Sequence, residues 1–330
     1  MRHIKSALLL ILAIILMAGC GKSGAAGEKK GAKTEGDYPK ETLNVIIPFG
    51  PGGGTDLYIR KIMDIVQKEK LYNGNIKIEN REGGSGAIGW GFLETKKGNP
   101  YYVAPTSGSF FTTPLVSETS FNYESFTPVA LMGADDLFLL VKGDAKYKNL
   151  EEFIKSAKSG KRMKIGGVGQ VSDEMIVPNL FAKEAGFEFD YVPFQGAGEL
   201  TSALLSNSLD AIVGNPARSL GQIEGGLMKP LAFSGLERLP QMDKVPTFKE
   251  LGFDVNLSQP RGIILAGDVD PEIKDWWVDT MKKVAETEEW ENYIKDNGMS
   301  NYMLFGDEFG EFLKDTNDKF ETSLNELDVE

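Results

Sequence analysis

The feature that most constrains the fold is an alternation of strand-like and helix-like segments joined by glycine-rich turns. Residues 43–47 form an apolar run typical of a buried strand, and the sequence PFGPGGGTD follows at residues 48–56. Beyond this turn, apolar residues recur at the spacing of one helical face: Ile59, Ile62, Met63 and Val66. Because similar units follow one another from residue 41 onward, the sequence predicts an α/β protein.

The turn at residues 48–56 is suited to binding an anion. Glycine lets the backbone come close to a ligand, and the first N–H groups of the following helix have no partner within that helix. Helix starts of this kind favour negative charge. We expect Thr55 or Asp56 to be the N-cap residue. A P-loop is excluded because Gly54 is followed by these two residues and not by lysine.

Length and charge narrow the possible partners. A chain of 330 residues is long enough for two lobes or domains. Its 36 basic and 48 acidic residues give a net charge of −12, which makes nucleic acid a poor partner. A small anion is compatible with this charge, because a helix terminus acts locally while salt screens a diffuse field within about 10 Å.

The N-terminus predicts a lipoprotein signal peptide over residues 1–19. Two basic residues precede an apolar run at residues 7–18, which is too short for a transmembrane span of about 20 residues. Residues 16–20, LMAGC, resemble a bacterial lipobox, in which the Cys20 sulfur is acylated and becomes the new N-terminus. The alternative is an ordinary signal peptide that happens to be followed by cysteine. Residues 20–40 are expected to form a flexible tether.

Cleavage before Cys20 would leave the mature chain without an imidazole or a free thiol. The only histidine is His3, in the segment that would be removed, and the only cysteine would be acylated. This excludes Ser-His-Asp and Cys-His catalysis, histidine-based metal sites and disulfides. We therefore expect no metal and no cofactor.

A second glycine-rich turn lacks the context of a dinucleotide site. Gly84, Gly86 and Gly89 match G-x-G-x-x-G after a strand-like run at residues 75–80. A dinucleotide site also needs an acidic residue about 20 positions further on, where residues 105–109 read PTSGS. We predict a turn that opens a helix.

Three charged residues near the strand ends have ordinary structural explanations. Asp135 and Asp136 lie between two strand-like runs, and adjacent carboxylates in a turn are expected to be solvated. Arg261 lies where the chain re-enters a strand, and we expect it to form a surface ion pair.

A further turn lies before the helix that follows the strand at residues 164–167. Ser172 is predicted to be the N-cap, and two acids follow it in the first helical turn, Asp173 and Glu174. The helix dipole favours acids at this position, so capping accounts for both.

Glycine-rich and polar loops follow five of the predicted strands, at residues 50–55, 106–109, 167–172, 195–198 and 214–216. In an open α/β sheet, ligands bind outside the carboxyl ends of the strands, where such loops lie. None of these loops supplies a nucleophile paired with a base, so they are suited to holding an anion and not to converting it.

Several motifs, in order and spacing, resemble the tripartite tricarboxylate transporter substrate-binding proteins, also called the Bug family. They are PFGPGGGTD at residues 48–56, ENR at 79–81, FTPVA at 126–130, YVPF at 191–194, LD at 209–210, VPT at 245–247 and ELG at 250–252. The resemblance implies a two-lobed periplasmic-binding-protein fold of type II, each lobe a mixed sheet flanked by helices, with a hinge of two crossover strands. It places lobe 1 at residues 41–135 and 260–330 and lobe 2 at residues 136–259.

The resemblance also implies that main-chain groups of both lobes hold a ligand carboxylate. Carried over by position, the ligand-binding residues are Phe49, Gly52, Gly53, Thr55, Asp56, Ser107 and Gly108 in lobe 1, and Gly169, Gln170, Ser172 and Asn215 in lobe 2. The chain departs from the family pattern at Glu82, where members commonly have proline, and at Gly214, near which many have an acid. Residues 170–173 also replace a serine-rich run. The lobe 2 half of the pocket is the half expected to set specificity.

By this resemblance, the chain is expected to be a monomeric, extracytoplasmic solute-binding protein and not an enzyme. It would capture a di- or tricarboxylate or a related organic acid and deliver it to the membrane subunits of a tripartite tricarboxylate-type transporter. The lipid on Cys20 would hold it at the outer face of the cytoplasmic membrane, or facing the periplasm where an outer membrane exists. One alternative is a receptor that presents its ligand to a sensor. Another is a surface hydrolase that uses carboxylates such as Asp56 or Asp173.

Overall fold

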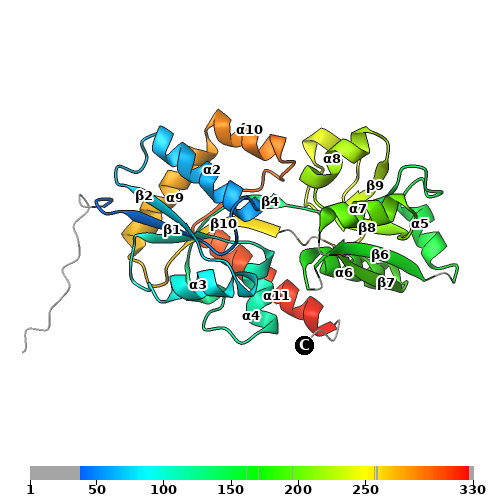
Figure 1. Ribbon diagram of the computed structural model, residues 1–330, viewed down its shortest axis with the longest axis horizontal. Coiled ribbons are helices and arrows are strands. Elements are labelled where there is room, and N and C mark those ends of the chain that lie inside the picture. Colours follow the sequence, from blue (N-terminus) through cyan, green and yellow to red (C-terminus); the bar gives the residue numbers. More distant parts are fainter. Residues whose placement is uncertain are drawn as a thin grey trace, which may run out of the picture. The chain divides into compact units, whose positions relative to one another are not determined.

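Two β-sheets, each flanked by helices, make up the described part of the chain (Figure 1). The computed structural model describes residues 38–326 except 161, 170, 195, 256 and 258. We call the six-stranded sheet with its helices lobe 1, and the five-stranded sheet with its helices lobe 2. Both sheets contain parallel and antiparallel strands, so the predicted fold of two mixed sheets flanked by helices is confirmed.

The lobe 1 sheet has the strand order β11-β4-β10-β3-β1-β2. Its strands are β1 (Leu43–Ile47), β2 (Ile76–Asn80), β3 (Tyr102–Pro105), β4 (Thr127–Asp135), β10 (Gln259–Leu265) and β11 (Leu304–Phe305). Strand β1 pairs in parallel with β2 and β3, whereas β10 runs antiparallel to both β3 and β4. The loops that follow β1 and β3 therefore leave the same edge of the sheet.

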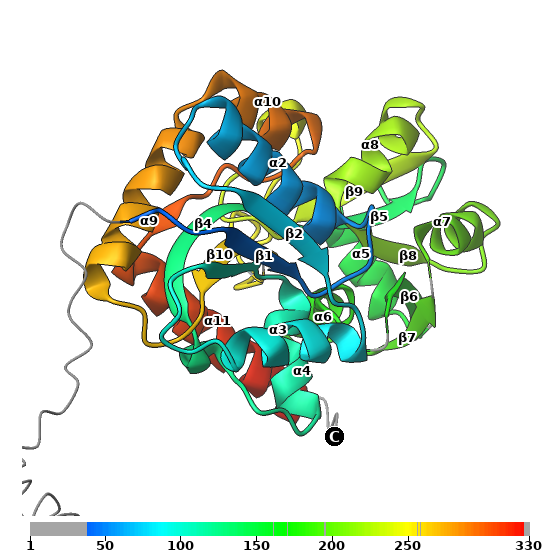
Figure 2. The ribbon, with the colours of Figure 1, turned by 60° about the vertical axis from the view of Figure 1, so that its left-hand side comes forward.

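The helices of lobe 1 cover both faces of its sheet. They are α2 (Gly54–Lys68), α3 (Ala87–Glu94), α4 (Gly108–Val116), α9 (Pro271–Ala285), α10 (Glu288–Asp296) and α11 (Asp307–Glu326). Figures 1 and 2 show α2, α9 and α10 on one face and α3, α4 and α11 on the other. The predicted inner face of α2 is confirmed, since Ile59, Ile62, Met63 and Val66 are buried. The predicted turn at the second glycine motif is also confirmed, as Gly84–Gly86 form a short 3₁₀ turn before α3.

The lobe 2 sheet has the order β7-β6-β8-β5-β9. Its strands are β5 (Phe138–Lys142), β6 (Met163–Val168), β7 (Phe189–Phe194), β8 (Ala211–Gly214) and β9 (Met228–Phe233), and its helices are α5 (Leu150–Ala157), α6 (Asp173–Ala185), α7 (Ala197–Leu205) and α8 (Pro216–Glu224). Alternate residues of β5 enter two different apolar clusters, Leu139 and Val141 one, Phe138 and Leu140 the other. Successive side chains of a strand point to opposite faces of the sheet, so both faces of this sheet are buried.

The chain crosses between the two sheets in both directions. The first crossing, from β4 to β5, consists only of residues 136–137, and the return from β9 to β10 spans residues 234–258. The hydroxyl of Ser234 ties these segments together, because it accepts the Leu137 N–H at 2.9 Å and donates to the Leu257 carbonyl at 3.4 Å. One apolar cluster contains residues of both lobes, among them Phe111 and Phe320 of lobe 1 and Phe181 of lobe 2.

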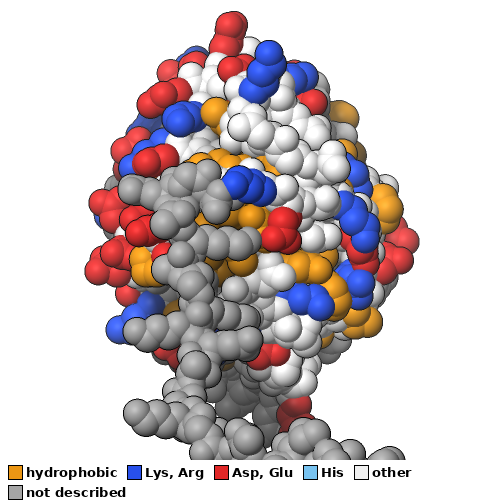
Figure 3. All heavy atoms as spheres, turned by 90° about the vertical axis from the view of Figure 1, so that its left-hand side faces the viewer, with side chains coloured by type: hydrophobic (Ala, Val, Ile, Leu, Met, Phe, Trp, Pro, Cys, Tyr) orange, Lys and Arg blue, Asp and Glu red, His pale blue; other side chains and the backbone are white. Residues whose placement is uncertain are grey.

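The surface of the described part is mixed in charge. On the face shown in Figure 3, acidic and basic side chains are interspersed with apolar patches. Many charges are paired across neighbouring elements, as Lys61 and Lys68 of α2 are with Glu289 of α10. Within residues 38–326, gaps aside, no helix is both long enough and apolar enough to cross a membrane.

Candidate functional site

The first predicted site loop joins β1 to α2 and starts the helix earlier than the sequence suggested. Gly53 is the N-cap residue and α2 begins at Gly54, so the expected cap at Thr55 or Asp56 is wrong. Instead of capping, the Asp56 carboxylate reaches back across the turn and accepts the Gly52 N–H at 2.9 Å. One amide of the loop is therefore occupied by a side chain of the protein. Gly52 has a φ of +82°, which side-chain-bearing residues rarely adopt.

Asp56 is a fixed anion that shapes this loop. Its carboxylate also accepts Arg60 Nε at 2.9 Å and Asn80 Nδ2 at 2.8 Å, and Asn80 Nδ2 donates to the Phe49 carbonyl as well. Burial alone would raise the pKa of Asp56, but the hydrogen bonds from Gly52, Asn80 and Arg60 outweigh it and hold the pKa below its usual 3.8. A carboxylate engaged in this way is a poor general base.

The Phe49 side chain contributes to packing at the start of the same loop. The residue is half-buried, and its ring lies edge-on against Trp90 of α3 with 5.6 Å between ring centroids.

Arg261 of β10 connects this loop to the crossing between the lobes. Its Nη1 donates to Thr55 Oγ1 at 2.8 Å, and its Nε and Nη2 both donate to Asp135 Oδ2. A Cβ added to Gly54 would lie 3.0 Å from Nη2, so the guanidinium packs directly against the first turn of α2. Arg261 is 7% exposed. The expected surface ion pair is wrong: the pair exists but is buried.

The neighbouring acids at the end of β4 are not solvated either. Asp135 pairs with Arg261, while Asp136 is 2% exposed and accepts a hydrogen bond from the Ser300 hydroxyl. The expectation of a solvated turn is wrong because these residues begin the crossing between sheets, where distant segments cover them. Ser300 is 164 residues away in sequence.

The second predicted loop of lobe 1 contains a buried hydroxyl without a partner. Ser107 is the N-cap residue of α4 by backbone geometry but makes no capping bond. Its Oγ is buried and has no hydrogen-bond partner among the described residues. The adjacent Thr106 differs, since its hydroxyl donates to the Pro260 carbonyl and accepts the Gly262 N–H. Burying an unpaired hydroxyl costs about 1–3 kcal/mol, which marks Ser107 as a candidate ligand contact.

In lobe 2, the loop after β6 is held by its neighbouring strand. The Gly169 N–H donates to the Phe194 carbonyl at 3.0 Å, and the Gly169 carbonyl accepts the Tyr191 hydroxyl at 2.8 Å. Ser172 is the N-cap residue of α6, as predicted, but its hydroxyl donates to the Val168 carbonyl and makes no cap bond. Gln170 lies outside the described residues.

The two acids after Ser172 do more than complement the helix dipole. Asp173 is 8% and Glu174 is 4% exposed. Glu174 accepts the Val168 N–H at 2.6 Å and Arg218 Nη2 at 3.2 Å. Burial and the nearby Asp173 nevertheless raise the pKa of Glu174 from 4.5 to about 7, and burial also raises the pKa of Asp173. The expectation that capping accounts for both acids is therefore wrong.

Asn215 and the β6 loop are linked through one arginine. Asn215 is the N-cap residue of α8, and its Oδ1 accepts Arg218 Nε at 2.8 Å. The same guanidinium contacts Glu174, so Arg218 ties the start of α8 to the start of α6.

The two lobes approach each other at the first residues of α4 and α6. A Cβ built on Gly108 would lie 3.8 Å from Asp173 Oδ1 and 3.4 Å from Gln259 Nε2. The predicted residues at 107–108 and at 172 are thereby brought to one region between the lobes. Arg261, which contacts Thr55, lies two residues after Gln259 in the same strand. Sequence reasoning did not select Asn80, Arg218 or Gln259. Only Asn80 had a signal, because it lies in the ENR motif.

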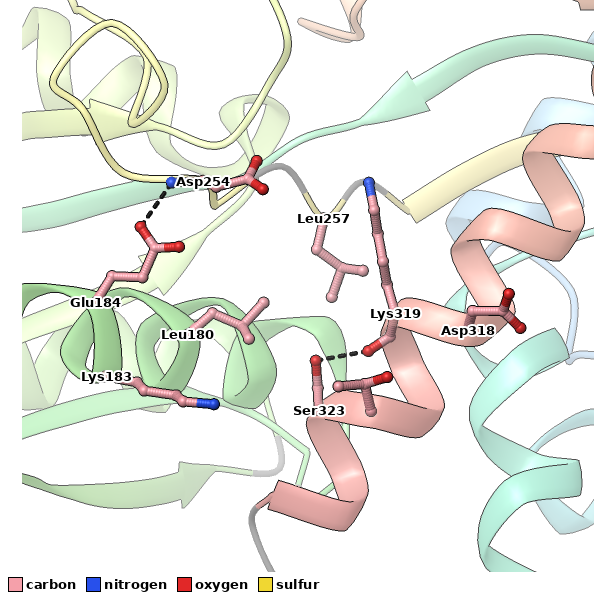
Figure 4. Close-up of a pocket in the computed structure, with 9 residues that line it drawn as sticks. Leu180, Lys183, Glu184, Asp254, Leu257, Asp318, Lys319 and Ser323 are labelled. Atoms are coloured by element: carbon pink, nitrogen blue, oxygen red, sulfur yellow. Dashed lines mark hydrogen bonds between the residues drawn. The ribbon is translucent and has the colours of Figure 1, made fainter.

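A cavity of about 360 Å³ lies apart from these loops, between α6 and α11 (Figure 4). Its lining includes Leu180 and Lys183 of α6, Leu257, and Lys319 and Ser323 of α11, and none of the predicted site residues. Among the described residues, no group of three or more acidic, histidine or cysteine side chains is placed to hold a metal ion. The predicted lipidation site, Cys20, lies outside the described residues.

The sequence model of the family described as "Tripartite tricarboxylate transporter family receptor" matches residues 59–329. Protein BugT of Bordetella pertussis is 26% identical over 244 residues, covering 72% of this chain and 74% of that protein. A UPF0065 protein of Cupriavidus necator is 22% identical over 292 residues, 88% of each chain.

Solved structures share the same architecture. The crystal structure of a TctC solute-binding protein from Polaromonas superposes with a TM-score of 0.81 at 27% identity, covering 88% of this chain and 99% of that chain. A protein of Rhodopseudomonas palustris crystallised with adipate gives a TM-score of 0.71 at 19% identity, over 88% and 98% of the two chains. MatC of the same organism, with bound malate, gives 0.67 at 19% identity, over 87% and 100%.

Proposed function

The chain belongs to the tripartite tricarboxylate transporter receptor family, and on this basis we propose that it captures a small carboxylate between its two lobes. The family consists of extracytoplasmic solute-binding receptors. Two neighbours of the same fold hold carboxylates, one malate and the other adipate. A di- or tricarboxylate, or a related organic acid, is accordingly the expected class of ligand.

The observation that carries the proposal is the approach of α4 in lobe 1 to α6 in lobe 2. Gly108 and Asp173 are the first residues of these helices, and a Cβ added to Gly108 would lie 3.8 Å from Asp173 Oδ1 across the gap between the lobes. Helix starts present free N–H groups and a favourable dipole to an anion. A ligand held there would touch both lobes, so its binding would favour the closed arrangement.

Because the nearby arginines are already paired, we expect main-chain groups to bind the ligand carboxylate. Arg261 is matched to Asp135 and Arg218 to Glu174, so neither guanidinium is left as an unpaired cation for a ligand. We infer that the amides of the loops at residues 52–56 and 107–108 make the principal contacts to the ligand carboxylate. Gly52 would act mainly by shaping its loop, because Asp56 already occupies its N–H.

Binding without chemical conversion is the expected activity. The sequence offers no imidazole beyond His3 and no thiol beyond Cys20 to activate a nucleophile. Asp56, a candidate for a carboxylate-dependent hydrolase, is held ionised by three donors and is poorly suited to take up a proton. In the cell, the lipid on Cys20 would anchor the monomer at the outer face of the cytoplasmic membrane, and the closed complex would dock on transporter membrane subunits.

The test is a thermal shift measurement on the purified chain with a panel of di-, tri- and monocarboxylates and amino acids at millimolar concentration. A ligand that binds only the folded state should raise the melting temperature. At a ligand concentration of 100 times its Kd, the free energy of unfolding should increase by about 2.7 kcal/mol. Recovery of the compound unchanged after prolonged incubation separates a receptor from a hydrolase. A panel without any shift would overturn the proposal.

A further inference from the structure

Asp173 is a buried acid near the predicted loops that forms no ion pair with an arginine among the described residues, although Arg218 and Arg261 attract its carboxylate from farther away. Three ion pairs surround these loops, and each joins one arginine to one buried carboxylate: Arg60 with Asp56, Arg218 with Glu174, and Arg261 with Asp135. In the part of the chain that the structure describes, Asp173 forms no such pair. The hydrogen-bond donor to its carboxylate is its own N–H.

The position of Asp173 places this carboxylate between the lobes. It is the first residue of α6, it is 8% exposed, and its Oδ1 lies 3.8 Å from the position of a Cβ on Gly108. The residue before Gly108 is Ser107, whose hydroxyl is also buried and without a partner among the described residues. Each lobe thus contributes one buried polar group near these helix starts: the Ser107 hydroxyl, which has no partner among the described residues, and the Asp173 carboxylate, whose hydrogen-bond donor is its own N–H.

Electrostatics limits what can bind beside Asp173. A buried carboxylate is costly unless a cation or several donors accompany it, and the start of α6 offsets that cost only in part. A ligand with carboxylates alone would bring a second negative charge towards the first. An ammonium group would instead supply a countercharge in direct contact and up to three hydrogen-bond donors.

We propose that the physiological ligand carries a protonated amine in addition to its carboxylate, with the ammonium group held by Asp173 and the Ser107 hydroxyl. This inference rests on the proposed function, since it assumes that the carboxylate of the same molecule is held by the lobe 1 loops. The ligand is then a zwitterionic amino acid or an amino-substituted di-acid, and Asp173 is the residue that selects it against a plain di-acid. Such a residue lies in the lobe 2 half of the pocket, where the sequence placed specificity.

Matched compounds separate this inference from carboxylate binding in general. Isothermal titration would compare succinate with aspartate and γ-aminobutyrate, and glutarate with glutamate and δ-aminovalerate. The native chain should bind the best ammonium-bearing member of a series roughly 10- to 100-fold more tightly than the parent di-acid, the range expected for a charge-assisted hydrogen bond. In Asp173→Asn, that preference should disappear while the parent di-acid binds equally well or better.

Glu151→Gln is the control, because Glu151 is likewise in the first turn of a lobe 2 helix but is exposed, and this variant should keep the native preference. Thermal unfolding of the unliganded variants establishes that they fold, and Asp173→Ser provides a second removal of the charge. A native chain that prefers the plain di-acids, or an Asp173→Asn variant that keeps the ammonium preference, overturns the inference and leaves carboxylate capture intact. Failure of every compound to bind overturns carboxylate capture itself.

Discussion

The buried pair of Arg261 and Asp135 is the ion pair whose disruption should cost the most stability. Their side chains are 8% and 13% exposed, so removing one partner strands the other charge away from water. We expect Arg261→Ala to lower the free energy of unfolding by about 3–5 kcal/mol. Urea unfolding followed by circular dichroism measures this loss. Adding Asp135→Asn to the variant should recover part of it, because the stranded charge is removed.

A matched control tests whether burial is the cause. Arg238 also donates to a carboxylate, that of Glu250, at 2.8 and 3.0 Å, but these side chains are 44% and 45% exposed. Arg238→Ala should therefore cost about 0–1 kcal/mol. Equal losses in Arg238→Ala and Arg261→Ala would contradict the argument.

Glu174 should make stability depend on pH in the direction opposite to most carboxylates. Its pKa in the folded chain is about 7 and its ordinary value is 4.5, so between these pH values the folded state binds the proton more tightly than the unfolded state. Stability from this group is present below pH 4.5 and is lost as the pH rises towards 7, by up to about 3 kcal/mol.

The comparison of the native chain with Glu174→Gln over this pH range isolates that contribution. The native chain should become less stable relative to the variant as the pH rises, because only the native side chain loses its proton. Asp173 and Arg218 face Glu174, so both must be retained in the comparison. Glu250→Gln is a suitable control. The Thr247 N–H lowers the pKa of this exposed acid, so replacing Glu250 should not reduce the loss of stability between pH 4.5 and 7. A stability difference that is constant with pH would contradict the prediction.

At the scale of single residues, the local sequence predicted a residue's place in a helix or turn better than it predicted its ion-pair and hydrogen-bond partners. Ser172 is at the predicted N-cap, and Gly50, Gly52 and Gly53 lie in the predicted turn. Burial of Arg261 was missed because its partner, Asp135, is 126 residues away. The burial of Asp173 was missed for a similar reason, since it depends on lobe 1 residues that only the tertiary fold brings close.

Among the secondary structure elements, α3 should tolerate little added volume at Gly89. A Cβ on Gly89 would lie 2.6 Å from Pro48 Cα, because the helix packs directly on the backbone of the β1–α2 loop. Gly89→Ala should therefore cost about 1–3 kcal/mol through overpacking, and should shift the loop that follows β1. Thermal unfolding and ligand titration measure the two effects.

Gly91 in the same helix provides the control. The nearest atom to a Cβ there is Ser120 Oγ at 3.8 Å, an ordinary contact. Gly91→Ala should be neutral or stabilising by up to about 1 kcal/mol, since alanine is the better helix former. If both substitutions destabilised the chain equally, the close packing of α3 on the loop would not be the reason.

The elements were largely predictable because their signals are local. Alternating apolar runs indicated the strands, and the 3.6-residue spacing indicated the buried face of α2. The N-cap of α2 was misplaced because Thr55 and Asp56 are better capping residues than glycine in general. In this loop Asp56 uses its carboxylate on Gly52 and Asn80 instead, which no helical pattern reveals.

For the whole molecule, ligand binding should protect two distant stretches of backbone together. If the ligand bridges the starts of α4 and α6, saturation with it should slow amide hydrogen exchange at residues 108–111 and 173–176. Helix α5, which lies outside this region, should exchange at an unchanged rate. Mass spectrometry of peptides with and without ligand makes the comparison. Protection confined to one lobe would show that the ligand does not bridge the two.

The two-lobed arrangement was predicted through the ordered set of motifs, and the topology of both sheets agrees with it. The motifs did not predict which loops lie next to each other in the folded chain. Which amides are occupied, as Gly52 is by Asp56, depends on the packed structure. The ligand-binding role of the predicted residues stays a prediction that the titrations above would test.

The two-residue connection between β4 and β5 sets how the lobes can move. Residues 136–137 span at most about 7 Å when fully extended, so the ends of β4 and β5 that they join cannot move far apart. We expect the lobes to move by rotation about this connection, with a displacement that grows with distance from that axis. Asp135 directly precedes this connection, so the rotation should displace its pair with Arg261 little. A substitution at the axis would therefore change ligand affinity by shifting the balance of open and closed forms, without altering any atom that touches the ligand.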